Sequence, residues 1–141
     1  LAWVPLILGV WQLALRINVN RWKKIIYAAS LLVVIDLVLD PGAVALHLWR
    51  YPGVGEGGLS EEYFFVPWIN FCGWLLSGSV GAWLVSRQVS APSRSLKWWL
   101  FPTMTGMAFW TGVALRLGYI PPIFIGGGLL LGLWCILKDD E

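Results

Sequence analysis

Two aspartates, Asp36 and Asp40, lie four residues apart in an otherwise apolar stretch. Side chains at this spacing project from one face of a helix, so we expect the two carboxyl groups to be neighbours. An ionised Asp near the centre of a bilayer costs at least about 2.5–3.5 kcal/mol, and such residues usually mark a site or a pathway. Two adjacent carboxyl groups sheltered from water do not both ionise readily, so one can hold a proton while the other is charged. The pair predicts acid–base chemistry; the alternative is that each Asp only clamps a neighbouring helix.

Other polar residues fall around this pair. Pro41 removes a backbone donor beside Asp40, which predicts a kink or break in the helix and a partly hydrated pocket. His47 lies seven residues beyond Asp40 and shares its face if the helix resumes. Asn70, in the next apolar segment, either bonds another helix or orients a water. Glu62, at the mouth of that segment, either reaches the pocket or is a solvated helix start.

Composition places these acids in a membrane protein. Of the 141 residues, 58% are hydrophobic and 13% are charged, whereas soluble domains are about half apolar and about a quarter charged. A bilayer accepts apolar surface on every lipid-facing side of a helix bundle. The net charge of +2 is too small to indicate a nucleic-acid partner.

Five segments approach the roughly 20 mostly apolar residues that a membrane-spanning helix needs. The predicted fold is therefore all-α, a single domain built as a polytopic transmembrane helix bundle. The predicted spans are 1–15, 25–48, 63–85, 98–115 and 119–137. Because the first span is short, we expect the chain to be a piece of a longer bundle. The glycines at 126–128 are expected to let another helix approach closely.

The distribution of basic residues predicts an orientation. Lys and Arg gather in the connections 16–24 and 86–97, and Lys138 opens the tail. Since these residues concentrate in cytoplasmic loops, both connections and the C-terminus are predicted inside, with 49–62 outside. The expected location is the plasma membrane of a prokaryote.

The chain has eleven Trp and two Cys. Trp is typical of membrane interfaces, although some of these rings could instead line a site for a flat apolar ligand or a cationic intermediate. Cys72 and Cys135 lie in apolar runs without metal-type spacing and are interpreted as packing residues.

Motifs for cofactor or metal chemistry are absent from the sequence. It contains no phosphate loop, HExxH, CxxC pair, GxSxG elbow or dinucleotide fingerprint, and it has one His. A histidine-rich di-iron centre within this chain is therefore excluded. The chemistry that remains needs acids, water and shape, and we expect no cofactor and no metal.

The middle of the chain resembles the membrane carotenoid biosynthesis family, which includes carotenoid 1,2-hydratases and bisanhydrobacterioruberin hydratases. The residues that carry the resemblance are Asp36 to Pro41, Leu48-Trp49, Tyr63 to Pro67, Asn70-Phe71 and Gly73-Trp74. There are departures, since the family more often has Gly where this chain has Phe65 and a second Trp near Trp49, where this chain has His47 and Arg50. The family also has further spans ahead of this region.

The resemblance implies addition of water to the terminal C1–C2 double bond of a linear carotenoid, without a redox cofactor. Such hydration needs an acid that protonates carbon, a place for a tertiary cation, and a positioned water. We assign Asp40 as the acid and Asp36 as its partner, or the reverse, with Asn70 orienting water. Trp49, Trp68 and Trp74 would flank the substrate, and His47 and Glu62 would complete the binding site. The partners predicted are a carotenoid or other long isoprenoid as substrate, membrane lipid, and other carotenoid enzymes.

Two other classes of protein fit the same residues. A helix with two acids and a break also suits a proton-coupled transporter, or a membrane protein that binds lipid or carotenoid without catalysis. A structural assembly subunit is the third reading. It would tolerate Asn at both Asp36 and Asp40, which the other two would not.

Overall fold

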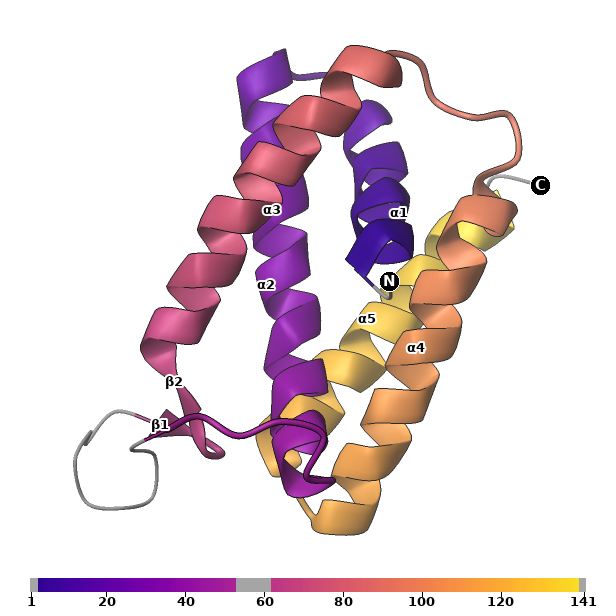
Figure 1. Cartoon of the computed structure of the whole chain (residues 1–141). Helices are drawn as coiled ribbons and strands as arrows, with labels where there is room; N and C mark the ends of the chain where they lie inside the picture. The colour runs from indigo at the N-terminus through magenta and orange to yellow at the C-terminus, as the bar shows by residue number, and fades with distance from the viewer. Residues whose placement is uncertain (1–2, 53–61, 140–141) are drawn as a thin grey trace.

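The computed structural model describes residues 3–52 and 62–139, and over these ranges it confirms five helices (Figure 1). The helices are α1 (Trp3–Leu15), α2 (Arg21–Ala45), α3 (Trp68–Gln88), α4 (Leu96–Leu117) and α5 (Ile120–Asp139). Two short strands, β1 (Glu62–Tyr63) and β2 (Val66–Pro67), form an antiparallel hairpin between α2 and α3. The described chain is thus all-α apart from this hairpin.

Helix α2 is the centre of the bundle, because it contacts each of the other four helices. Leu32 and Val38 on α2 are fully buried and belong to one apolar core with Trp11 of α1 and Met107 of α4. Burial of such side chains is the main favourable contribution to folding, at about 25 cal/mol per Å² of apolar surface. A polar group on the inward side of α2 is therefore kept from both lipid and bulk water.

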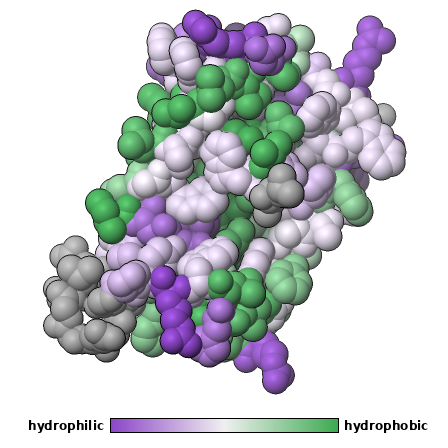
Figure 2. Space-filling view, in the orientation of Figure 1, coloured by the Kyte–Doolittle hydropathy of each residue, from purple (hydrophilic) through white to green (hydrophobic). Residues whose placement is uncertain are grey.

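Three helices, α2, α3 and α5, are long and apolar enough to span a membrane, by length and composition. Helix α1 is apolar but has 13 residues, and α4, with 22 residues, is not among the three. Figure 2 shows hydrophilic residues gathered at the two ends of the bundle, with mostly hydrophobic or near-neutral residues between them. The five predicted spans thus correspond to five helices, of which three are candidate membrane spans, and this indicates an integral membrane protein.

Of the kink or break predicted at Pro41, the break is wrong, since α2 runs without interruption to Ala45. Proline removes one backbone donor, but tertiary packing keeps this part of α2 helical. Pro41 and Gly42 are both buried, and Gly42 lies so close to the ring of Trp110 that a side chain there would collide with it. Packing against α4 therefore overrides the local tendency to end the helix.

Helix α2 ends instead in a left-handed turn at His47, whose φ is 58°. The N–H of His47 donates to the carbonyl of Val44 at 3.0 Å, and the N–H of Leu48 donates to that of Ala43 at 2.9 Å. This is the hydrogen-bond pattern of a Schellman cap, in which the chain turns away from the helix. His47 is consequently exposed, and the expectation that it shares a face with Asp40 is wrong.

The third predicted span begins at residue 63, but α3 begins at Trp68, because residues 62–67 form the hairpin. Pro67 has an extended backbone and is the residue from which α3 starts. Proline also favours an extended residue before it, which suits the end of a strand. The hairpin therefore occupies the place where the first turn of the predicted helix was expected.

The turn of the hairpin is made by two phenylalanines in the left-handed region. The φ angles of Phe64 and Phe65 are 50° and 64°. Two successive residues with positive φ are the geometry of a type I′ turn, which favours Asn and Gly because they have little steric cost there. Stacking offsets part of this cost at Phe64, whose ring lies 4.3 Å from that of Tyr119. Phe65 is 55% exposed and has no stacked ring among the described residues.

The described connections alternate between the two ends of the bundle. Residues 16–20, residues 89–95 and the end of α5 lie at one end, whereas the hairpin and the left-handed turn at Gly118 lie at the other (Figure 1). The predicted outer connection 49–62 is only partly described, since residues 53–61 lie outside the described ranges.

The two cysteines and the three glycines at 126–128 were expected to pack against other helices, and only one glycine does. Cys72 and Cys135 are exposed, so their interpretation as packing residues is wrong. Gly126 does allow a close approach, because a side chain there would overlap Thr111 of α4, but the next two glycines face open space. The tight contact between α4 and α5 therefore depends on one glycine of the three.

Candidate active site

The acid pair lies on the inward side of α2, where Asp36 is 0% and Asp40 is 1% exposed. One helical turn separates them, so both point to the same side of the central helix. The two carboxyl groups lie close enough to interact with each other. The structure thus places both acids together on one sheltered face.

Asn70, in the first turn of α3, joins the two acids. Its Nδ2 donates to Asp36 Oδ2 at 3.1 Å and to Asp40 Oδ2 at 2.5 Å. A side-chain amide nitrogen carries two hydrogens, so it can serve both carboxyl groups at once. Of the two roles open from the sequence, the bond to another helix is the one that the structure contains.

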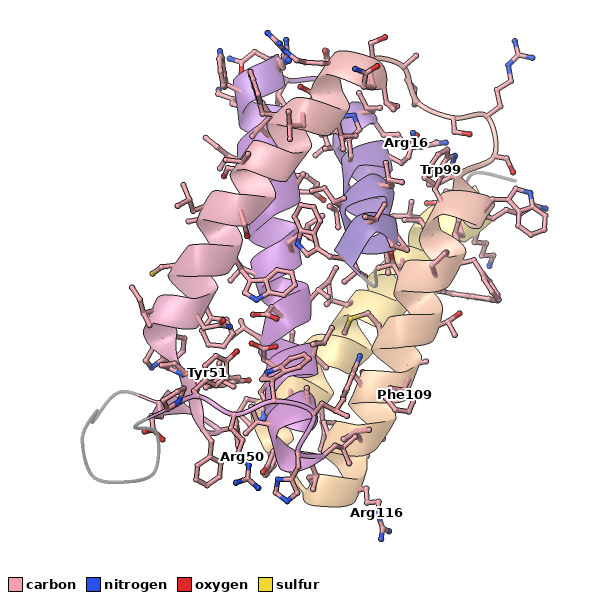
Figure 3. The ribbon with its side chains drawn as sticks, viewed as in Figure 1. Arg16, Arg50, Tyr51, Trp99, Phe109 and Arg116 are labelled. Carbon is pink, nitrogen blue, oxygen red and sulfur yellow. The ribbon has the colours of Figure 1, made fainter. Side chains whose placement is uncertain are left out.

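Tyr51 is a fourth member of the site, and the sequence reasoning missed it. Its hydroxyl donates to Asp40 Oδ2 at 2.7 Å from the non-helical chain after α2 (Figure 3). Burial raises the pKa of Tyr51 above its usual value, and the hydrogen bond to Asp40 raises it further. The phenol is therefore a protonated donor at neutral pH. The sequence did contain an indication of this role. Tyr51 follows the acids closely and precedes Pro52, which prevents the helix from continuing.

One oxygen of the site has no hydrogen-bond partner among the described residues. Asp36 Oδ1 is buried and accepts no hydrogen bond from the described residues, whereas Asp40 accepts from both Asn70 and Tyr51. Buried polar atoms are nearly always bonded, so an unbonded carboxyl oxygen in a native site calls for an explanation such as a catalytic role. The two acids therefore have different surroundings although they lie on the same helix.

The predicted aromatic residues divide into two groups. Trp49 lies beside the Tyr51 side chain, at the edge of the acid network. Trp74 lies one turn after Asn70 on α3 and packs against the main apolar core. Trp68 is half exposed and belongs to an aromatic cluster at the hairpin, with its ring 5.5 Å from that of Tyr63.

Glu62 lies on β1 opposite Pro67, partly buried, at the mouth of α3 where the sequence predicted it. Its neighbour in the hairpin, Tyr63, has a buried hydroxyl without a described partner, and burial raises the pKa of Tyr63 to about 12. His47 is exposed beyond the end of α2. Glu61 lies outside the described residues.

The chemistry that this arrangement supports is proton transfer. Over residues 3–52 and 62–139, no group of three or more His, Cys, Asp or Glu side chains is placed to hold a metal ion. The functional groups that do converge are two carboxyl groups, an amide and a phenol. Carboxyl groups with unlike surroundings are suited to divide the roles of acid and base.

Fold and site together define a helical membrane protein with a buried acid pair on its central helix. A family model described as "Carotenoid biosynthesis protein" matches residues 1–133, and the chain belongs to this carotenoid biosynthesis protein family. The bisanhydrobacterioruberin hydratase of Haloarcula japonica is 38% identical over 84 residues, which cover 57% of this chain and 26% of that protein. The chain thus spans about a quarter of the length of this curated relative. No solved structure matches the chain.

Proposed function

We propose that the protein adds water to the terminal carbon–carbon double bond of a linear carotenoid by acid catalysis. The observation that carries the proposal is the pair of buried, mutually adjacent acids held by Asn70 and Tyr51. Membership of the carotenoid biosynthesis family and similarity to a protein named as a hydratase support it. The reaction is an addition of water without oxidation, which matches a site built from groups that move protons.

The surroundings of the two acids favour Asp36 as the proton donor. Asp40 accepts hydrogen bonds from Asn70 and Tyr51, and accepted hydrogen bonds stabilise a carboxylate. Asp36 Oδ1 is fully covered and has no hydrogen-bond partner in residues 3–52 and 62–139, which suits a neutral carboxylic acid. The proton is therefore assigned to Asp36 and the negative charge to Asp40, the second of the two orders that the sequence left open.

The reaction then runs in three proton movements. Asp36 gives its proton to C2 of the terminal double bond, whose π electrons form the new C–H bond and leave a tertiary cation at C1. A water oxygen attacks C1, and Asp40 accepts the proton that this oxygen loses. Transfer of that proton from Asp40 to Asp36 restores the starting state, so the net change is alkene plus water to tertiary alcohol.

The cation at C1 is the species that the site must stabilise. The carboxylate of Asp40 supplies negative charge in a water-poor setting, where electrostatic interactions are strong. An aromatic face can add cation–π attraction of about 0.5–2 kcal/mol, and Trp74 is on the same side of α3 as Asn70. Substrate contact is assigned to Trp74 and Trp49 among the predicted Trp residues.

The end group must reach acids that are covered in this structure. Tyr51 covers Asp40 and is attached to non-helical chain, unlike Asn70, which is fixed in α3. Movement of Tyr51 is therefore the route that disturbs the bundle least. The end group of a carotenoid dissolved in the bilayer would then reach Asp36 and Asp40 by entering at the hairpin end of the helices.

The hairpin end is assigned to the outer side of a prokaryotic plasma membrane, with the connections 16–24 and 86–97 and the C-terminus inside. A cysteine introduced at the exposed Arg50, with Cys72 and Cys135 replaced by Ser, should react with an impermeant thiol reagent on intact cells. Protection of that cysteine in intact cells, with labelling after lysis, would reverse the orientation.

The function is tested by expressing the full chain in a bacterial host that makes lycopene. The expected product is lycopene that has gained one water per reacted end, identified by mass spectrometry. Asp36→Asn and Asp40→Asn should each lower the yield by about 100-fold or more, the usual scale of general acid–base catalysis. Asp139→Asn, at an exposed position far along the chain, is the matched control and should leave the yield unchanged.

Each variant must elute as a folded protein in detergent for its loss of product to count. Full activity in both Asp36→Asn and Asp40→Asn refutes the assignment of the site. Carotenoid that moves across vesicles with a pH gradient and keeps its mass supports transport instead.

A further inference from the structure

A second polar region lies at the opposite end of the bundle from the acid pair, where α4 begins and α5 ends (Figures 1 and 3). A pocket of about 430 Å³ opens there. Three basic residues line it, namely Arg94, Lys97 and Lys138, and no acidic residue of the described ranges 3–52 and 62–139 does. We call this site the basic pocket.

The three cations of the basic pocket are unpaired within the described part of the chain. None of Arg94, Lys97 and Lys138 forms an ion pair or a hydrogen bond with a residue in 3–52 or 62–139. Like charges gathered without a counter-charge repel one another, and this favours binding of an anion between them. The pocket therefore has the charge of an anion site.

The backbone that carries Arg94 is fixed by contacts with α1. The N–H of Ser93 donates to Gln12 Oε1 at 2.8 Å, and Arg16 donates to the carbonyl of Ser93 at 3.1 Å. Trp11 Nε1 donates to the carbonyl of Val89 at 2.8 Å, near the start of the same connection. A site whose backbone is already ordered loses less conformational freedom when it binds a ligand.

Apart from Ser95, the remaining wall of the basic pocket is apolar and continues onto a candidate membrane span. The apolar residues are Leu96, Trp134 and Leu137. Trp134 and Leu137 belong to α5, and Trp134 is 62% exposed on it. Lys138 lies in the last turn of α5, so the cations are at the level where a spanning helix leaves the membrane. A ligand that fits must carry both an anionic group and an apolar chain.

We propose that the basic pocket binds the phosphate group of an anionic membrane phospholipid, with an acyl chain lying along Trp134 and Leu137 of α5. The cations contact the phosphate and the apolar wall contacts the chain. Free phosphate satisfies only the first of these contacts. This site lies outside the acid pair, so the proposal does not depend on the hydration reaction.

The test is native mass spectrometry of the full chain in detergent, titrated with phosphatidylglycerol or with phosphatidylcholine. We expect one phosphatidylglycerol to bind at least about tenfold more tightly than phosphatidylcholine. Each basic residue near an anionic lipid contributes about fivefold to affinity, so Lys97→Gln should weaken binding about fivefold. The triple variant R94Q/K97Q/K138Q should weaken it on the order of 100-fold.

Lys23→Gln is the matched control, because Lys23 is an exposed cation at the same end of the bundle but outside the pocket. It should bind phosphatidylglycerol as the wild type does, and circular dichroism should show equal helix content in all variants. The proposal is overturned if Lys23→Gln weakens phosphatidylglycerol binding as much as Lys97→Gln does. It is also overturned if the wild type binds phosphatidylcholine as tightly as phosphatidylglycerol. Displacement of the lipid by inorganic phosphate at equal concentration overturns it as well, since the acyl chain would then contribute nothing.

Discussion

At the hairpin end, Asp36 and Asp40 are covered by protein and held by donors from α3 and from the chain after α2. At the other end, Arg94, Lys97 and Lys138 are exposed around an open pocket and have no described partner. Both groups concentrate charge of one kind, yet only the acids are bonded inside the fold. The difference between the two sites is therefore the hydrogen bonding of their charged groups. The acids are bonded by other residues of the protein, whereas the cations are left to bind a ligand.

The largest expected effect comes from removing the donor that the two acids share. Asn70→Leu keeps a similar volume but deprives both carboxyl groups of their amide donor. Hydration should fall about 100-fold, and the free energy of unfolding should fall by about 3 kcal/mol, because hydrogen bonds to charged groups contribute about 1.5–3 kcal/mol each. Product yield and thermal unfolding in detergent measure the two effects.

Ser79→Ala is the control on the same helix, since Ser79 is partly exposed and its hydroxyl donates to the carbonyl of Leu75 in α3 itself. It should be neutral in both measurements. If Asn70→Leu were equally neutral, the acids would not depend on their partners and the contrast between the two ends would disappear.

A smaller effect is expected at Tyr51, which bonds only one of the acids. Tyr51→Phe removes one hydrogen bond to Asp40 and should lower the hydration rate about tenfold, equivalent to about 1.4 kcal/mol. Because burial and Asp40 raise the pKa of Tyr51, the phenol keeps its proton well above neutral pH. The ratio of wild-type to variant rates should therefore stay constant between pH 6 and pH 9.

The pH profile of Tyr51→Phe separates positioning from mere packing. A ratio that collapses toward one as the pH rises to 9 would mean that the phenol ionises in this range, against the assignment. Tyr27→Phe is a suitable control, because Tyr27 is an exposed residue of α2 without a bond to the acids.

The hairpin next to the acids stores backbone strain, and relieving it should stabilise the protein. Phe65→Gly keeps the left-handed backbone of the turn but removes its steric cost, which is roughly 1–2 kcal/mol for a residue with a Cβ. We expect the free energy of unfolding to rise by about 1 kcal/mol, measured by thermal unfolding in detergent. Phe64→Gly relieves similar strain but loses the stacked contact with Tyr119, so it should gain less or lose stability. Equal gains in the two variants would contradict a role for the stacking.

The smallest effect on stability is expected at the basic pocket. In detergent without anionic lipid, Lys97→Gln and Lys138→Gln should each change the free energy of unfolding by no more than about 0.5 kcal/mol, because exposed residues without partners contribute little. Addition of phosphatidylglycerol should raise the melting temperature of the wild type more than that of the variants. A large loss of stability without lipid would show that these cations are bonded within the fold, as the acids are.

The sequence predicted the helices, the shared face of Asp36 and Asp40, and the approach of Asn70's helix, because apolar runs and the spacing of acids depend on local periodicity. It did not predict the continuous helix at Pro41, since that depends on packing against Trp110 from a distant segment. Tyr51 was missed for a related reason: its contact with Asp40 arises only after the chain turns back at His47.

The uninterrupted course of α2 has a consequence for how the acid pair responds to its surroundings. Asp36 and Asp40 both lie in one continuous helix, so the distance between their backbone positions is set by helix geometry. Breathing of the bundle, or a thicker or thinner bilayer, can alter how easily a substrate enters, but the two proton-carrying groups move as one rigid unit. Lipid composition should therefore change the concentration of substrate needed for half-maximal rate far more than the rate at saturation.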